Sequence, residues 1–166
     1  EVILYSSKQI IPNIQEIQER IKKIAPEVEA MSPYVFSEVM LAHKSRVVGS
    51  VVEGIEEDSV KKTTRLERHI SQGTFPKTGE IPGIVLGSVL AEKLSAGLGA
   101  EISLISPYFE KNSLQPRAKK FQVQGIVSSG MYEYDSKYSL MNIDDATNFF
   151  RLPSASASAL KMKTSD

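Results

Sequence analysis

Residues 121–150, FQVQGIVSSGMYEYDSKYSLMNIDDATNFF, carry the pattern that decides the fold. Apolar side chains alternate along 121–127 and predict a strand, and the polar run at 128–130 ends it. An exposed aromatic and acidic loop is expected at 131–135, followed by a second strand over 138–142. Strand, loop and strand in this order favour a mixed α/β domain.

A short helix is expected to close this stretch. Asp144 or Asp145 is predicted to cap it, because acidic side chains favour the first turn of a helix. In the loop before it, the tyrosines are expected to pack while Glu133 and Asp135 face water. The unit by itself names no function.

The first third of the chain predicts a helix packed on a sheet. Residues 2–6 read as a strand, and Asn13 with Glu16 resembles a capping box at the start of a helix that Pro26 ends. Strands are expected over 31–35, 39–42 and 47–55, with a turn at 43–46. The helix carries an apolar stripe that we assign to the core: Ile14, Ile17, Ile21 and Ile24.

Beyond residue 55 the expectations are less regular. Residues 56–80 predict a charged surface connection with short helices near Val60 and at 66–70. A strand over 84–86 should lead into a helix capped by Ser88 and lined by one leucine row, Leu90, Leu94 and Leu98. Strands 101–106 and 121–127 are expected to pair as a long hairpin. The Ser/Ala run at 154–159 is either a linker or an edge segment before a last strand.

Composition excludes several classes of function. The 166 residues are 41% hydrophobic, and 20 basic residues balance 20 acidic ones, so no nucleic-acid-binding surface is indicated. The absence of cysteine excludes disulfides and thiol chemistry. No apolar run reaches 18 residues, so we expect neither a spanning helix nor a secretion signal in this sequence.

The sequence also lacks the residues of an active site. His43 and His69 are its only histidines, and without supporting ligand spacing they are expected to be solvated. The acidic run from Glu56 to Asp58 lacks the spacing of a calcium loop and is expected to start a helix. We therefore expect no catalysis, no cofactor and no metal.

Three blocks of this sequence resemble one known family. They are GIVSSGMYEYD at 125–135 with the following Asp144-Asp145-Ala146, VVEGI at 51–55, and IVLG at 84–87. They are similar to the extracytoplasmic domain of the LolC/LolE family of lipoprotein-releasing ABC transporter permeases. The resemblance implies an α+β fold with MacB-like architecture, in which residues 1–81 and 128–166 form a membrane-proximal mixed subdomain and residues 82–127 an inserted strand-rich one.

The same resemblance implies a location and a set of partners. It implies a periplasmic domain of an inner-membrane permease that helps to extract lipoproteins and to pass them to a LolA-like carrier. A separate LolD-like subunit would hydrolyse ATP, beside a second permease subunit. The sequence leaves open a LolC-like or LolE-like role, a MacB-like or FtsX-like mechanotransmission domain, and a free-standing small enzyme or ligand-binding protein.

The segment between the two hairpin strands is the candidate partner-binding site. It gathers aromatic, apolar and cationic side chains, which are enriched at protein interfaces: Tyr108, Phe109, Leu114, Pro116 and Arg117. By resemblance this is the projecting hairpin with which LolC-type subunits engage their carrier. An ordinary long hairpin, kept soluble by its lysines and arginines, is the other interpretation.

Overall fold

The computed structural model describes the whole chain except residues 1, 7–9, 108–111, 113–114 and 166. Its elements follow in chain order: β1 (Val2–Tyr5), α1 (Ile14–Ile24), β2 (Val28–His43), β3 (Arg46–Ile55), α2 (Glu57–Thr63), the 3-10 helix η1 (Leu66–His69), β4 (Ile70–Gly73), β5 (Gly83–Gly87), α3 (Ser88–Leu94), β6 (Glu101–Ile105), β7 (Ala118–Val127), α4 (Tyr132–Lys137), β8 (Tyr138–Asn142), α5 (Ile143–Phe149) and β9 (Ala159–Thr164). The mixed α and β fold expected from the sequence is confirmed.

Six of the strands close into a barrel. Their hydrogen-bonded order is β2-β3-β8-β5-β7-β6, and the ring closes because β6 pairs with both β7 and β2. Two core pairs mark the closure, Leu41 opposite Leu104 and Ile102 opposite Phe121. All four side chains are at most 1% exposed, so the barrel interior is a packed core.

Helices α3 and α5 complete this core. Leu90 and Leu94 of α3 and Ala146 and Phe149 of α5 belong to the barrel cluster. Helix α5 lies so close to β3 that a Cβ added at Gly54 would come within 2.5 Å of the Ala146 Cβ. Only a glycine at position 54 permits this approach.

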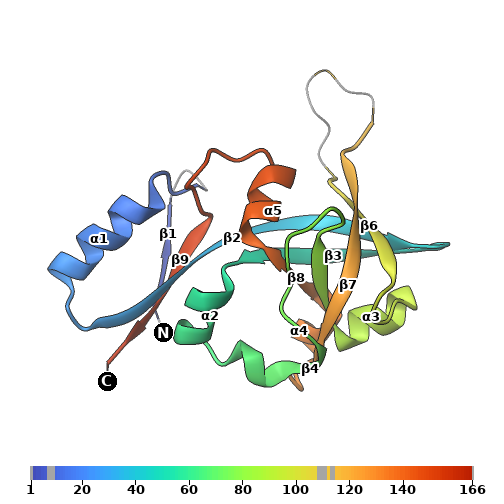
Figure 1. Cartoon of the computed structure of the whole chain (residues 1–166), viewed down its shortest axis with the longest axis horizontal. Helices are drawn as coiled ribbons and strands as arrows, with labels where there is room; N and C mark the ends of the chain where they lie inside the picture. The colour runs from blue at the N-terminus through green and yellow to red at the C-terminus, as the bar shows by residue number, and fades with distance from the viewer. Residues whose placement is uncertain (1, 7–9, 108–111, 113–114, 166) are drawn as a thin grey trace.

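A smaller sheet extends from the barrel along the long strand β2. The first half of β2 pairs with β9, which pairs with β1, and Figure 1 shows this sheet with α1 to the left of the barrel. Helix α1 covers it through Ile14, whose cluster includes Leu160 and Met162. The subdomain boundaries expected at 81/82 and 127/128 stay a prediction, and strands from both sides of them pair within one ring.

Several expectations from the sequence are confirmed. Strand β8 has the bounds expected for it, strand β1 covers four of its five expected residues, and β6 pairs with β7 as an antiparallel hairpin. Helix α1 ends before Pro26, and α2 and η1 lie in the expected charged connection. Alternation and proline placement are local signals, and they served well here.

The expected helix-capping bonds were wrong. Asn13 does occupy the N-cap position of α1, as expected, but it is left-handed, with φ 50°, and its side chain makes no capping bond. Ser88 lies inside α3, which begins after Gly87. Helix α5 is capped by Asn142, whose Oδ1 accepts the Asp144 N–H at 2.9 Å, instead of by either aspartate.

Two expected core positions were also wrong. Ile24 is 81% exposed in the last turn of α1, outside the cluster to which Ile14, Ile17 and Ile21 belong. Leu98 is 49% exposed because α3 ends at Leu94.

The largest differences from the expected strands are the following. The strands expected at 31–35 and 39–42 are one continuous strand, β2, and the charged connection contains an additional strand, β4. The Ser/Ala run is neither a linker nor an edge. Ala157 forms a bridge with Ile11, and the following strand β9 lies between β1 and β2.

Candidate functional site

The hairpin of β6 and β7 carries the candidate partner-binding segment. Its pairing continues past the strand ends, since the Ser106 N–H donates to the Arg117 carbonyl at 2.8 Å. Of the connecting residues described, Pro107, Asn112, Gln115 and Pro116 are exposed. The hairpin leaves the barrel on the side opposite the two marked chain ends (Figure 1).

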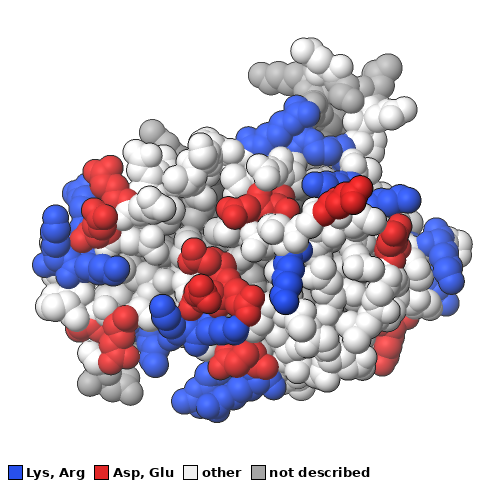
Figure 2. Space-filling model, viewed as in Figure 1, with Lys and Arg blue, Asp and Glu red and all other residues white. Residues whose placement is uncertain are grey.

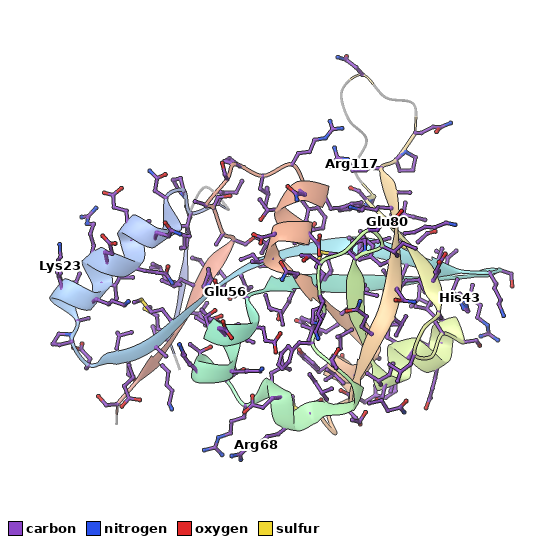
Figure 3. The ribbon with its side chains drawn as sticks, in the orientation of Figure 1. Lys23, His43, Glu56, Arg68, Glu80 and Arg117 are labelled. Carbon is purple, nitrogen blue, oxygen red and sulfur yellow. The ribbon has the colours of Figure 1, made fainter. Side chains whose placement is uncertain are left out.

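Arg117 fixes the base of this hairpin. Its guanidinium donates to the Phe149 carbonyl at the end of α5 and lies 5.9 Å from the Phe149 ring centroid. Burial, followed by the charge of Arg151, lowers the pKa of Arg117 below its usual range. Figure 3 shows Arg117 at the foot of the hairpin, where it orients the connection relative to α5.

The structure thus places two of the five predicted site residues. Arg117 is at the base and the exposed Pro116 is next to it. Tyr108, Phe109 and Leu114 lie outside the described residues. The assignment of all five to partner binding stays a prediction.

A second feature is the turn before α4, which departs from the expected exposed loop. Asp135 is 4% exposed, and its carboxylate accepts three hydrogen bonds from the turn. The donors are the Ser129 N–H at 2.9 Å, the Ser129 hydroxyl at 2.7 Å and the Gly130 N–H at 3.2 Å. Glu133 does face water and pairs with Lys137 at 2.9 Å. Asp135 is therefore a structural residue whose role sequence reasoning missed.

This turn displays an apolar pair on the surface. Met131 and Tyr132 are 62% and 63% exposed, directly after the residues that Asp135 holds. Tyr134 packs on Tyr138 with ring centroids 4.6 Å apart, as expected for the loop tyrosines, whereas that expectation was wrong for the exposed Tyr132. Burial raises the pKa of Tyr134, so its hydroxyl stays neutral.

A cleft of about 340 Å³ lies beside the turn. Its walls come from α2 and η1 on one side and from the turn on the other, including Leu66, His69 and Met131. At its floor Glu53 and Lys161 are mostly buried and lie 3.7 Å apart, and the Lys161 ammonium lies 4.5 Å from the Tyr34 ring centroid. The two charges at the floor compensate each other, so the walls determine the polarity and the net charge of the cleft.

The described residues offer no metal centre, since no three His, Asp or Glu side chains among them gather at one place. His43, expected to be solvated, is partly buried, and its Nδ1 lies 3.0 Å from the Leu94 carbonyl at the end of α3. His69 is exposed at the rim of the cleft.

One acidic group is expected to oppose folding. Asp145 has a buried Oδ2 without a hydrogen-bond partner among the described residues, and burial raises its pKa. A carboxyl whose pKa is raised by folding contributes stability below its unfolded pKa, near 4. That contribution is lost as the pH rises through its pKa in the folded protein. We expect Asp145→Asn to raise the melting temperature at pH 7 and to leave it nearly unchanged at pH 3.5. Equal shifts at both values, measured by circular dichroism, would contradict this.

Comparisons with known proteins agree with this fold. No family model matches the sequence. The chain is 33% identical over 144 residues to the lipoprotein-releasing system transmembrane protein LolC of Neisseria meningitidis serogroup B, covering 82% of the chain. It is 22% identical over 164 residues, 97% of the chain, to LolE of Haemophilus influenzae. It spans 34% and 39% of these relatives, somewhat over a third of their length.

Solved structures show the same fold. The extracellular domain of the noncanonic ABC-type transporter YknZ from Gram-positive bacteria superposes with a TM-score of 0.66 at 14% identity, covering 99% of this chain and 82% of that one. The periplasmic region of MacB from Actinobacillus actinomycetemcomitans gives 0.61 at 17% identity, with 94% and 66% covered. Within the described residues, no helix is long and apolar enough to cross a bilayer.

These findings define the class as the periplasmic domain of an ABC transporter permease of the Lol and MacB type. The relatives are components of transporters. The chain belongs to the LolC/LolE family.

Proposed function

We propose that this domain helps to extract lipoproteins from the inner membrane and to hand them to a LolA-like periplasmic carrier. The observation that supports it most is the 33% identity to a LolC protein across 82% of the chain. Acyl chains strongly resist entering water, so holding the acceptor close to the exit path avoids exposing them. Positioning then replaces chemistry, and ATP hydrolysis belongs to a separate LolD-like subunit beside a second permease subunit.

The orientation of the hairpin supports this role. Strands β1 and β9 are antiparallel, with Val2 opposite Met162, so both chain ends emerge at one place. In a permease whose flanking segments enter the membrane there, the β6–β7 hairpin points away from the bilayer (Figure 1). Its described connecting residues are exposed, as a carrier-binding arm requires.

The test is a titration of this chain with the LolA-like carrier of the same organism, by calorimetry. Replacing residues 108–115 with a short glycine turn keeps the Ser106–Arg117 pair and should weaken binding at least about tenfold, because hot-spot side chains are lost. The matched control Lys22→Glu/Lys23→Glu alters exposed residues of α1 and should bind normally. Undiminished binding by the folded loop variant would contradict the carrier-binding role of the hairpin.

A mechanotransmission role is the second candidate, favoured by the structural likeness to MacB. In that case neither the intact chain nor the loop variant binds the carrier, and the partner is an efflux adaptor or a cell-wall hydrolase. The absence of carrier binding by both folded proteins favours this candidate, or a LolE-like role facing the lipoprotein.

A further inference from the structure

The outer surface of α2 and η1 carries three exposed cations that no ion pair among the described residues holds. Lys62, Arg65 and Arg68 are exposed, and none of them makes an ion pair with another described residue. Glu57 pairs with Lys61 at 2.5 Å, which leaves Glu56 at the N-cap of α2, Asp58 and Glu67 as the nearby acids. Glu56 lies at the other end of α2 from Arg68, so the excess of cations is at the end of α2 and on η1 (Figure 3). Figure 2 shows Lys and Arg gathered at the lower edge of the molecule, and Figure 3 shows Arg68 projecting from that edge.

The cleft described above combines positive charge with apolar walls. Arg65 and His69 line its rim, and Val60, Leu66 and Val127 give it apolar walls. Since Glu53 compensates Lys161 at the floor, the net charge of the cleft is the positive charge of Arg65 at the rim. A cationic rim over apolar walls matches an amphiphile with an anionic head.

Met131 lies on the wall of this cleft opposite α2 and η1, and the exposed Tyr132 follows it in the chain. Asp135 holds the turn that presents them, so they are displayed by an ordered segment. The Tyr132 ring also has the Lys93 ammonium 5.8 Å from its centroid. Aromatic and apolar side chains interleaved with lysine and arginine are typical of surfaces that rest at the interface of a bilayer.

The location agrees with such a surface. Figure 1 shows η1, the segment before α4 and the marked C-terminal end along the same lower side of the molecule. If the proposed function holds, the flanking segments of the permease bring this side to the inner membrane. The hairpin, on the opposite side, then remains free for a carrier.

We propose that Lys62, Arg65 and Arg68, with the neighbouring Met131 and Tyr132, form a docking surface for the anionic phospholipid bilayer. The cations bind headgroup phosphates, and the apolar pair inserts at the level of the glycerol backbone. Each basic residue at such a surface contributes an increment of attraction that salt screens. This docking fixes the angle of the domain above the membrane, and so the direction of the hairpin.

The chain contains no tryptophan, so a single introduced one reports on insertion. Tyr132→Trp is titrated with phosphatidylcholine vesicles that contain or lack 30 mol% phosphatidylglycerol. We expect a blue shift of emission only with the anionic vesicles, lost at high salt. The matched reporter Phe36→Trp, at a 44% exposed position of β2, should not shift. No shift of Tyr132→Trp, or the same shift with neutral vesicles, would overturn the proposal.

Charge reversal provides the second arm. Arg65→Glu/Arg68→Glu in the Tyr132→Trp chain should reduce vesicle binding at least about tenfold, whereas Lys22→Glu/Lys23→Glu, with the same change of net charge, should not. Carrier binding is measured on the same proteins. Unchanged vesicle binding after Arg65→Glu/Arg68→Glu would contradict the docking surface and leave the carrier role intact. Loss of carrier binding with normal vesicle binding would contradict the carrier role alone.

Discussion

Phe121→Ala should lower the free energy of unfolding by about 3–5 kcal/mol, the range for truncating a buried aromatic side chain. Phe121 is fully buried in the barrel. Its ring meets Phe149 of α5 edge to face, with centroids 6.5 Å apart at 80°. The substitution therefore leaves a cavity where the sheet and the helix share one contact. Urea denaturation followed by circular dichroism measures the loss.

The matched control is Phe36→Ala, which removes an aromatic ring that is 44% exposed on the outside of the barrel. It should cost about 1 kcal/mol or less. Similar losses for the two substitutions would mean that the barrel interior does not dominate stability. Because Phe149 also receives the Arg117 guanidinium, Phe121→Ala should in addition loosen the base of the hairpin.

Asp135→Ala is expected to cost about 3 kcal/mol, because it strips three donors of one buried, charged acceptor. The Ser129 and Gly130 N–H groups would lose their shared partner, and the turn that carries Met131 would lose its order. Thermal and urea unfolding give the magnitude. Increased proteolysis near residue 130 would locate the change.

Substitutions of two neighbouring residues provide comparisons for the loss of stability in Asp135→Ala. Ser129→Ala removes one hydroxyl donor and should cost about 1 kcal/mol. Glu133→Ala removes only an exposed ion pair and should leave the free energy of unfolding nearly unchanged. If Asp135→Ala behaves like Glu133→Ala, the carboxylate is not the centre of the turn.

Local patterns in the sequence predicted local structure well. The β6–β7 hairpin follows from alternation of apolar residues within each strand, and the strand at 138–142 from a short apolar run after a polar loop. Closure of the barrel leaves no such signal. It depends on Leu41 meeting Leu104, more than sixty positions along the chain, and neither residue differs from an ordinary strand residue.

The misplaced caps and acids have a common cause. Asn142, Asp135 and Ser88 can each accept a backbone hydrogen bond, and sequence alone does not say which donor lies within reach. Asp135 follows Gly130 by five residues, a spacing that one turn of α4 closes onto the Ser129 hydroxyl. A search for an acid one helical turn beyond a Ser-Gly pair could have found it.

The shared strand β2 has a mechanical consequence. At about 3.3 Å per residue its 16 residues reach about 50 Å, from its pairing with β9 beside the chain ends to its pairing with β6 in the hairpin. Hydrogen bonds between antiparallel strands lie across the strand direction. Force applied along β9 therefore loads its bonds to β2 in shear, together instead of one by one. Such a joint behaves as a stiff strut, so that a displacement at the chain ends reaches the hairpin without being absorbed on the way.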